Sequence, residues 1–187
     1  MKNKPLYLLV GKSASGKTTI ANILESQYGL PQLQSYTTRP KRHENETGHI
    51  FISNEEFDQL ENIVAYTEYN GYRYCATKEQ IDQTSVYVID VPGVDTLLEK
   101  YITERPIIVL YFDAPVTTRI ERMMDRGSSD TEIVSRIYND EKDNWVTQLS
   151  GILCYHDRGI MYLIDADASI DNVLMDIEFY INISKGE

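Results

Sequence analysis

A phosphate-binding loop is the feature that most restricts the fold of this chain. Residues 11–18 read Gly-Lys-Ser-Ala-Ser-Gly-Lys-Thr, which matches the pattern GxxxxGK[ST] in full. A short apolar run, Leu6 to Val10, precedes the loop, and a helical pattern follows it directly. Backbone N–H groups of such a loop surround phosphates, and the dipole of the following helix favours the same anion. The sequence therefore predicts a nucleoside triphosphate site at the first turn of an α/β sheet.

The chemistry of the loop assigns a role to its last two residues. Lys17 is expected to place its charge on the β- and γ-phosphates, and the Thr18 hydroxyl is expected to ligate Mg²⁺. We expect ATP to be the phosphoryl donor. The residues expected to bind it are Gly11, Lys12, Ser13, Ala14, Ser15, Gly16, Lys17 and Thr18.

Length and composition are typical of one globular domain. The chain has 187 residues, of which 42% are hydrophobic and 25% are charged. Its net charge of −11 argues against a broad nucleic-acid surface, because phosphate neutralisation needs clustered Lys and Arg. The two cysteines, Cys75 and Cys154, have no metal-ligand spacing. The apolar N-terminal run is too short for a signal peptide or a membrane span. We therefore expect a cytoplasmic protein, monomeric or homodimeric, that binds neither nucleic acid nor membrane.

Continuous apolar runs alternate with helical patterns along the chain. After the first run, Val86 to Val91 and Ile107 to Phe112 are expected to be parallel strands covered on both faces, with a weaker strand at Met161 to Ile164. Three helical patterns lie between and after them, and their apolar stripes are expected to face the core. These positions are Ile20, Ile23, Leu24 and Tyr28; Val116, Ile120, Met123 and Met124; and Ile170, Val173, Leu174, Ile177 and Ile181. The alternation predicts an α/β fold with a doubly wound parallel sheet, whose ligands bind at the carboxyl ends of the strands.

The region from about 35 to 77 interrupts this alternation. It is rich in Tyr, Asn and Glu, and two capping boxes, Ser53 to Glu56 and Thr77 to Gln80, each predict the start of a short helix. Arg39 and Arg42 lie three positions apart beside several hydroxyl groups. Because arginine fits phosphate oxygens bidentately, this pair indicates a second phosphate site, for an acceptor.

Together with the phosphate loop, these motifs resemble those of the guanylate kinase family of P-loop nucleoside monophosphate kinases. The similarity rests on Ser35-Tyr-Thr-Thr-Arg-Pro-Lys-Arg42 with Gly48 and His-Ile-Phe51, and on Asn70-Gly-Tyr-Arg-Tyr74. Further along, Val88-Ile-Asp-Val-Pro-Gly-Val94 and Asp125-Arg-Gly127 with Arg136 resemble the family's later motifs. The resemblance implies a single domain with a core at 1–34 and 78–187, an acceptor-binding insertion at about 35–77 and a helical lid at about 126–135.

The resemblance also implies roles for individual residues. The expected acceptor-binding residues are Ser35, Arg39, Arg42, Tyr74 and Asp90. Asp90 is also expected to hold Mg²⁺ together with Thr18. The expected catalytic residues are Lys17, Arg39, Arg126 and Arg136, the last two acting on the transferring phosphoryl group when a mobile lid closes. Phosphoryl transfer needs positioning and charge compensation more than covalent help, which explains the arginines.

The base-reading positions depart from the family. Its usual Glu is replaced by Asn45, its phosphate-contacting Tyr by Phe51, its guanine-reading acid by Ala65 and its O6-contacting Ser by Ala76. We expect Glu68, Glu44 or Glu46 to supply the missing acceptor for guanine if guanine is bound. The alternative is that all three merely solvate the surface, which is the commoner situation for any one glutamate.

Three functions compete. The leading one is ATP-dependent phosphorylation of GMP or dGMP. The second keeps the kinase and changes the acceptor to another (deoxy)nucleotide or a ribose phosphate. The third is an inactive interaction module of the guanylate-kinase-like type. Because Lys17, Thr18, Asp90 and the lid arginines are all present, the third ranks last.

Overall fold

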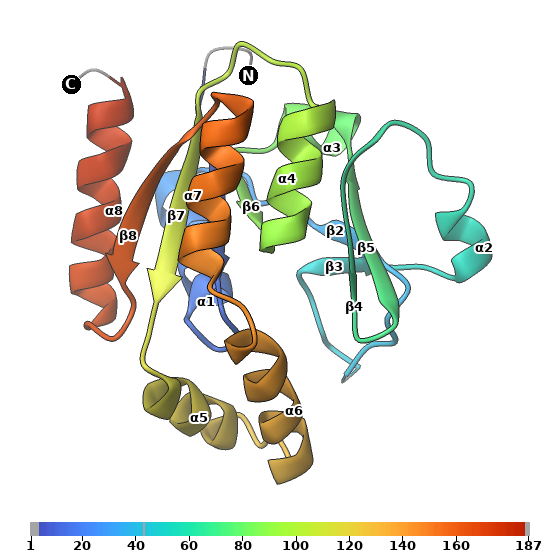
Figure 1. The fold of residues 1–187 in the computed structure, drawn as a ribbon, viewed down its shortest axis with the longest axis vertical. Coiled ribbons are helices and arrows are strands. Elements are labelled where there is room, and N and C mark those ends of the chain that lie inside the picture. The colour runs from blue at the N-terminus through green and yellow to red at the C-terminus, as the bar shows by residue number, and fades with distance from the viewer. Residues whose placement is uncertain (1–3, 43, 186–187) are drawn as a thin grey trace.

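The central sheet has four parallel strands in the order β6-β1-β7-β8 (Figure 1). The computed structural model of the chain describes residues 4–42 and 44–185. The strands are β1 (Leu6–Gly11), β6 (Val86–Val88), β7 (Ile107–Asp113) and β8 (Ile160–Asp165). Apolar side chains fill both faces of β1 and β7, as continuous hydrophobic runs require.

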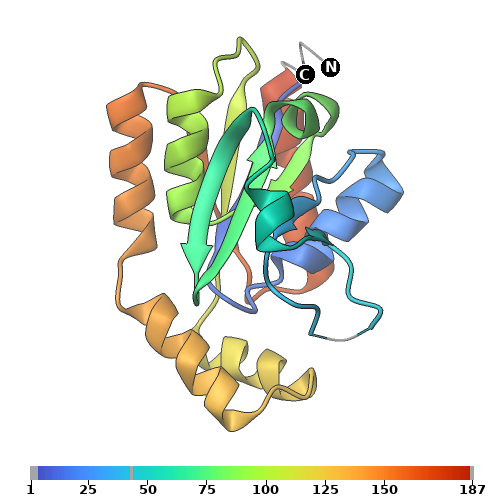
Figure 2. The ribbon, with the colours of Figure 1, turned by 90° about the vertical axis from the view of Figure 1, so that its right-hand side faces the viewer.

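Helices cover both faces of this sheet, as Figure 2 shows. Helices α1 (Lys17–Tyr28) and α8 (Ile170–Lys185) pack on one face around Leu9 and Leu110. Helices α4 (Val91–Lys100) and α7 (Trp145–His156) pack on the other face around Leu8 and Val109. The chain thus has two hydrophobic cores with the sheet between them, and the predicted doubly wound α/β fold is confirmed.

A second, smaller sheet lies beside α4 and has the order β3-β2-β5-β4. Its strands are β2 (Ser35–Thr37), β3 (His49–Phe51), β4 (Ile63–Tyr69) and β5 (Tyr72–Thr77). Helix α2 (Asn54–Phe57) follows β3, and helix α3 (Lys78–Gln83) leads back to the central sheet. Both helices begin with the capping boxes predicted from the sequence.

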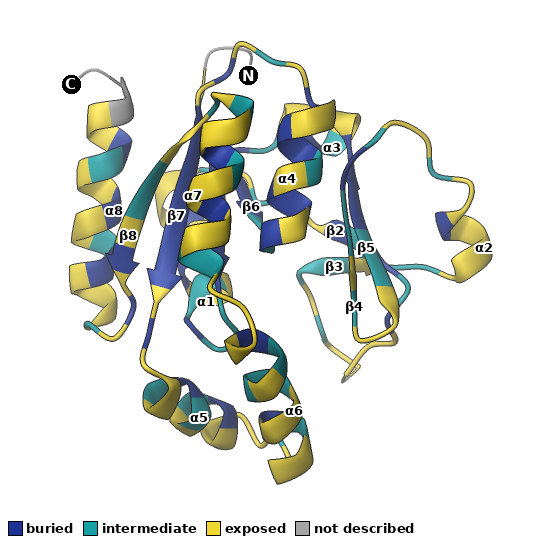
Figure 3. Cartoon of the chain, viewed as in Figure 1, coloured by how far each residue is buried: buried dark blue, intermediate teal, exposed yellow. Residues whose placement is uncertain are grey.

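Helices α5 (Val116–Asp125) and α6 (Asp130–Glu141) project from the carboxyl end of the central sheet and are largely exposed (Figure 3). The apolar stripe predicted for α5 is wrong in part. Met123 is buried, but Val116 is 39% exposed and Met124 is 58% exposed. The other buried residue of α5 is Arg119, whose burial a hydrophobic pattern does not reveal.

Two further predictions need correction. The strand expected over residues 86–91 ends at Val88, because Asp90 caps helix α4, which begins at Val91 with proline in its first turn. The apolar stripes of α1 and α8 are shorter than predicted: Tyr28 is 38% exposed, and Ile170 is 51% exposed, so the stripe of α8 begins at Val173. Among the residues described, no helix is both long enough and apolar enough to cross a bilayer.

Candidate active site

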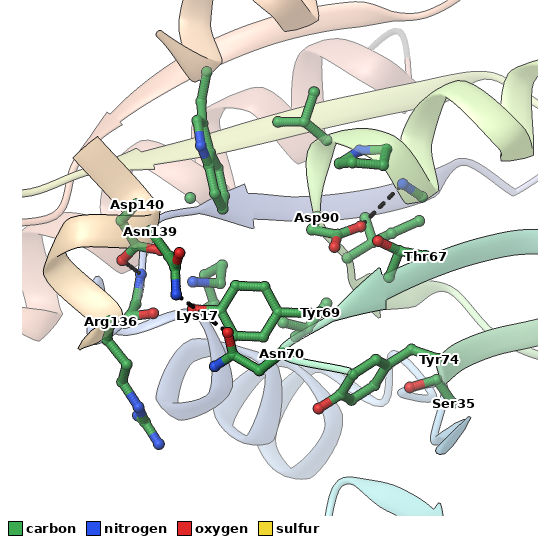
Figure 4. A pocket seen from close by; sticks show the side chains of 18 of the residues that line it. Lys17, Ser35, Thr67, Tyr69, Asn70, Tyr74, Asp90, Arg136, Asn139 and Asp140 are labelled. Carbon is green, nitrogen blue, oxygen red and sulfur yellow. Dashed lines mark hydrogen bonds between the residues drawn. The ribbon is translucent and has the colours of Figure 1, made fainter. Parts of the chain in front are cut away.

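The carboxyl ends of β1 and β6, the second sheet and helix α6 enclose a cavity of about 560 Å³ (Figure 4). We call it the central cavity. It is lined by residues from all parts of the predicted site. The predicted residues that line it are Gly11, Ser13, Ala14, Lys17, Thr18, Ser35, Arg39, Arg42, Tyr74, Asp90, Arg126 and Arg136. Lys12, Ser15 and Gly16 belong to the same loop but lie outside this set.

The loop between β1 and α1 is shaped by its glycines. A Cβ at Gly11 would lie 2.5 Å from the Phe112 carbonyl oxygen, so only glycine fits there beside β7. Gly16 caps α1 with φ 95°, in the left-handed region. Lys17 Nζ donates to the Lys12 carbonyl oxygen at 2.8 Å and to Ser15 Oγ at 3.2 Å. Burial lowers the pKa of Lys17 to about 8, and the nearby Asp140 carboxylate opposes that shift. An incoming phosphate would meet a cation that is short of counter-charge.

Arg39 lies across the central cavity, at the end of β2, and is 8% exposed. Its guanidinium forms two hydrogen bonds with Glu46, at 2.8 and 3.1 Å. Its Nε is buried and has no hydrogen-bond partner among the described residues. Arg42 is half-exposed beside it, and its backbone N–H donates to Glu46 at 2.6 Å.

His49 is a residue of this site that sequence reasoning missed. Its Nδ1 lies 2.9 Å from Ser35 Oγ, and its ring packs edge-on against Tyr74. Burial and the neighbouring Arg39 lower the pKa of His49 to about 4. Phe51, which stands on the same strand, lies under the Arg39 guanidinium at 5.3 Å from the ring centroid. The signal available in the sequence was the alternation of β3, which places His49 and Phe51 on one face.

Asp90 lies between the two sheets as the N-cap of α4. Its Oδ1 accepts the Gly93 N–H at 2.9 Å (Figure 4), and burial raises the pKa of this carboxyl group. A Cβ at position 93 would lie 2.9 Å from the same oxygen, which explains the glycine. Thr18 lines the same cavity. A carboxylate and a hydroxyl beside a phosphate loop suit Mg²⁺, which keeps several waters and binds through few protein ligands.

Helix α6 carries the second predicted lid arginine. Arg136 Nη2 pairs with Glu132 at 2.5 Å, one turn earlier on the helix. Arg126 follows directly after α5 and is exposed. Asn139 Nδ2 donates to Asn70 Oδ1 at 3.1 Å, which joins α6 to the turn between β4 and β5 (Figure 4). Both arginines line the central cavity.

The base-reading positions are apolar in the structure. Ala65 and Ala76 are 1% and 0% exposed and lie opposite each other on β4 and β5. Of the three glutamates expected as substitutes, Glu68 lines the central cavity, where the Tyr66 hydroxyl donates to it. Glu46 is engaged with Arg39, and Glu44 lies outside the cavity lining. Glu68 is therefore the remaining candidate.

The chain has a phosphate loop at the first turn of a doubly wound sheet, and a second sheet and a helical arm face that loop. These features are typical of P-loop kinases. The chain is 24% identical to a guanylate kinase of Nitrosomonas europaea over 143 residues, 70% of each chain. It is 23% identical to a guanylate kinase of Fusobacterium nucleatum over 151 residues, 74% of this chain and 80% of that one. In sequence the chain is therefore similar to guanylate kinases over about three quarters of its length.

The fold has a solved counterpart. The crystal structure of guanylate kinase from Anaplasma phagocytophilum superposes with a TM-score of 0.56, covering 99% of this chain and 86% of that one at 15% identity. At this identity the likeness concerns the fold alone. No model of a known protein family matches the chain.

Proposed function

We propose that the protein transfers the γ-phosphoryl group of ATP to GMP or dGMP, giving ADP and the nucleoside diphosphate. The observation that carries the proposal is the central cavity itself. Lys17 and other residues of the phosphate loop line it together with Arg39 and Arg42. Two phosphate-binding groups that share one cavity suit in-line transfer between two bound phosphates.

The residues divide the work by position. Lys17 and the loop N–H groups hold the β- and γ-phosphates of the donor, while Arg39, Arg42, Ser35 and Tyr74 hold the acceptor phosphate. Arg126 and Arg136 compensate the charge that spreads over the transferring phosphoryl oxygens. When bound at Thr18 and Asp90, Mg²⁺ would neutralise charge on the β- and γ-phosphates.

A different acceptor is the second candidate, because Ala65 and Ala76 leave the family's guanine-reading positions buried and apolar. A site built to hydrogen-bond a base edge discriminates by several orders of magnitude, and an apolar one does not. Another (deoxy)nucleotide or a ribose phosphate would need only the phosphate contacts.

The test is ADP release from ATP and Mg²⁺ with a panel of nucleoside monophosphates, deoxynucleoside monophosphates and ribose phosphates. The proposal expects GMP or dGMP to give the highest kcat/KM. Arg39→Met should lower kcat/KM for every acceptor alike, by about one to two decades, because all share the phosphate. A strong preference for another base or a sugar phosphate would select the second candidate. ADP release that no acceptor stimulates would overturn the kinase proposal.

A further inference from the structure

Asp140, on the last turn of α6, reaches the phosphate loop. Its carboxylate is 1% exposed, and its Oδ2 accepts two hydrogen bonds. The Ser13 N–H of the loop donates at 2.7 Å, and Arg119 Nη1 of α5 donates at 3.1 Å. Figure 4 shows Asp140 at the edge of the central cavity, on the same side as Lys17 and Arg136. The sequence gives no periodic signal for this contact, which spans 127 positions.

The surrounding charges hold Asp140 in place. Arg119 also donates from Nε to the Ala114 carbonyl oxygen at 3.2 Å and pairs with Glu141 through Nη2. Glu141 in turn pairs with Lys12 of the loop at 2.9 Å. Two adjacent carboxylates of α6 therefore bind two adjacent residues of the phosphate loop, and Arg119 is the shared counter-charge.

This arrangement has two opposite consequences for a bound nucleotide. Because the Asp140 carboxylate accepts the Ser13 N–H of the phosphate loop, its negative charge lies beside the donor phosphates and repels a triphosphate bound in that loop. At the same time, Arg136 stands one helical turn before Asp140. Fixing Asp140 to the Ser13 N–H therefore fixes the position of Arg136 relative to the donor phosphates.

We propose that Asp140 is a positioning residue that weakens donor binding and sets Arg136 against the donor loop for phosphoryl transfer. The kinetic half of this inference rests on the proposed function. The binding half does not, because it concerns the free protein and ATP alone.

The first measurement is the Kd of MgATP for the wild type and for Asp140→Asn, which keeps the shape and an acceptor oxygen but removes the charge. We expect binding to tighten by about tenfold and kcat to fall by about tenfold. Asp176→Asn, the same charge change on the exposed face of α8, is the control. It should change neither value.

A second variant distinguishes a role of Asp140 in positioning Arg136 from a role in the stability of the fold. Arg119→Met with Asp140→Leu replaces the buried ion pair by apolar side chains, which is often neutral for folding. We expect its Tm to lie closer to the wild-type value than that of Asp140→Asn, and its kcat to stay low. MgATP binding should tighten less than in Asp140→Asn, because the Arg119 cation is lost together with the Asp140 charge. An unchanged Kd in Asp140→Asn would overturn the inference, as would a kcat that recovers together with Tm in the double variant. A wild type that phosphorylates no acceptor would refute the proposed function, and the Kd comparison would still decide the role of Asp140 in donor binding.

Discussion

Lys17 couples donor binding to pH at the level of a single residue. Burial lowers its pKa to about 8 in the free protein, and bound phosphate would favour the charged form. Binding of ATP should therefore take up a proton above that pH, and affinity should fall by up to about tenfold per pH unit between about pH 8 and pH 10. The measurement is the Kd of MgATP across this range. Lys17→Met should bind weakly with a flatter profile, and Lys17→Ala should lower turnover by about a hundredfold or more. A wild-type profile as flat as that of Lys17→Met would contradict this role.

The proposed contact between Glu68 and the acceptor base can be tested with a single substitution. Neutralising it in Glu68→Gln should lower kcat/KM for GMP by about tenfold to a hundredfold, because one charge-assisted contact is lost. Use of an acceptor without a guanine edge, such as a ribose phosphate, should change little. Glu61→Gln, an exposed change just before β4, is the matched control. Equal losses for every acceptor would show that Glu68 acts on the phosphate or on the fold instead of on the base.

The sequence predicted those strands and helices whose burial or start is marked by a local residue pattern. The strands β1 and β7 and the two capped helices of the insertion follow from continuous apolar runs and from capping boxes. The sequence did not predict the boundaries and buried faces of elements that contain buried polar groups. The strand expected over residues 86–91 is cut short by the Asp90 cap, and the stripe of α5 is displaced by Arg119, which is buried through its pairing with Asp140. A hydrophobic pattern does not reveal that a charged residue is buried when its ion-pair partner comes from another element.

Asp90 caps the N-terminus of α4, and we propose that it also binds Mg²⁺. Two substitutions can separate these roles. Asn caps a helix about as well as Asp, so Asp90→Asn should leave the free energy of unfolding within about 0.5 kcal/mol of wild type. The same change removes the carboxylate that we propose for Mg²⁺, so half-saturation should need more Mg²⁺ and kcat should fall. Denaturant unfolding and a magnesium titration of turnover measure the two effects. Asp90→Ala, which removes the cap as well, should cost about 1 kcal/mol in addition. A normal Mg²⁺ dependence in Asp90→Asn would place the metal elsewhere.

On the scale of the whole molecule, the phosphate loop and the alternation of strands and helices predicted the doubly wound sheet. The second sheet was expected only as an insertion of short extended pieces. Strands β2 and β3 are indeed short, and β2 pairs with the distant β5. Strands β4 and β5 are longer and form a hairpin around Asn70-Gly71, a local turn signal that the sequence analysis did not use. The site residues predicted from motifs largely converge on one cavity, yet Asp140 and His49 were missed. Asp140 pairs with Ser13, 127 positions away, and such a distant contact leaves no local pattern. For His49, which pairs with Ser35, the available signal was the alternation of β3.

Because Glu46 pairs with Arg39, the free energy of unfolding should depend on pH in the acid range. Two hydrogen bonds from Arg39 and one from the Arg42 backbone lower the pKa of Glu46 from 4.5 to about 2. A carboxyl group with a lowered pKa stabilises the fold above its unfolded pKa, and this contribution is lost as pH falls from about 4.5 to about 2. Glu46→Gln should therefore be less stable than wild type by roughly 3 kcal/mol at neutral pH. The difference should shrink toward zero near pH 2, as followed by denaturant midpoints at several pH values. A deficit that stays constant with pH would mean that the loss comes from packing and hydrogen-bond geometry, with no contribution from the charge of Glu46.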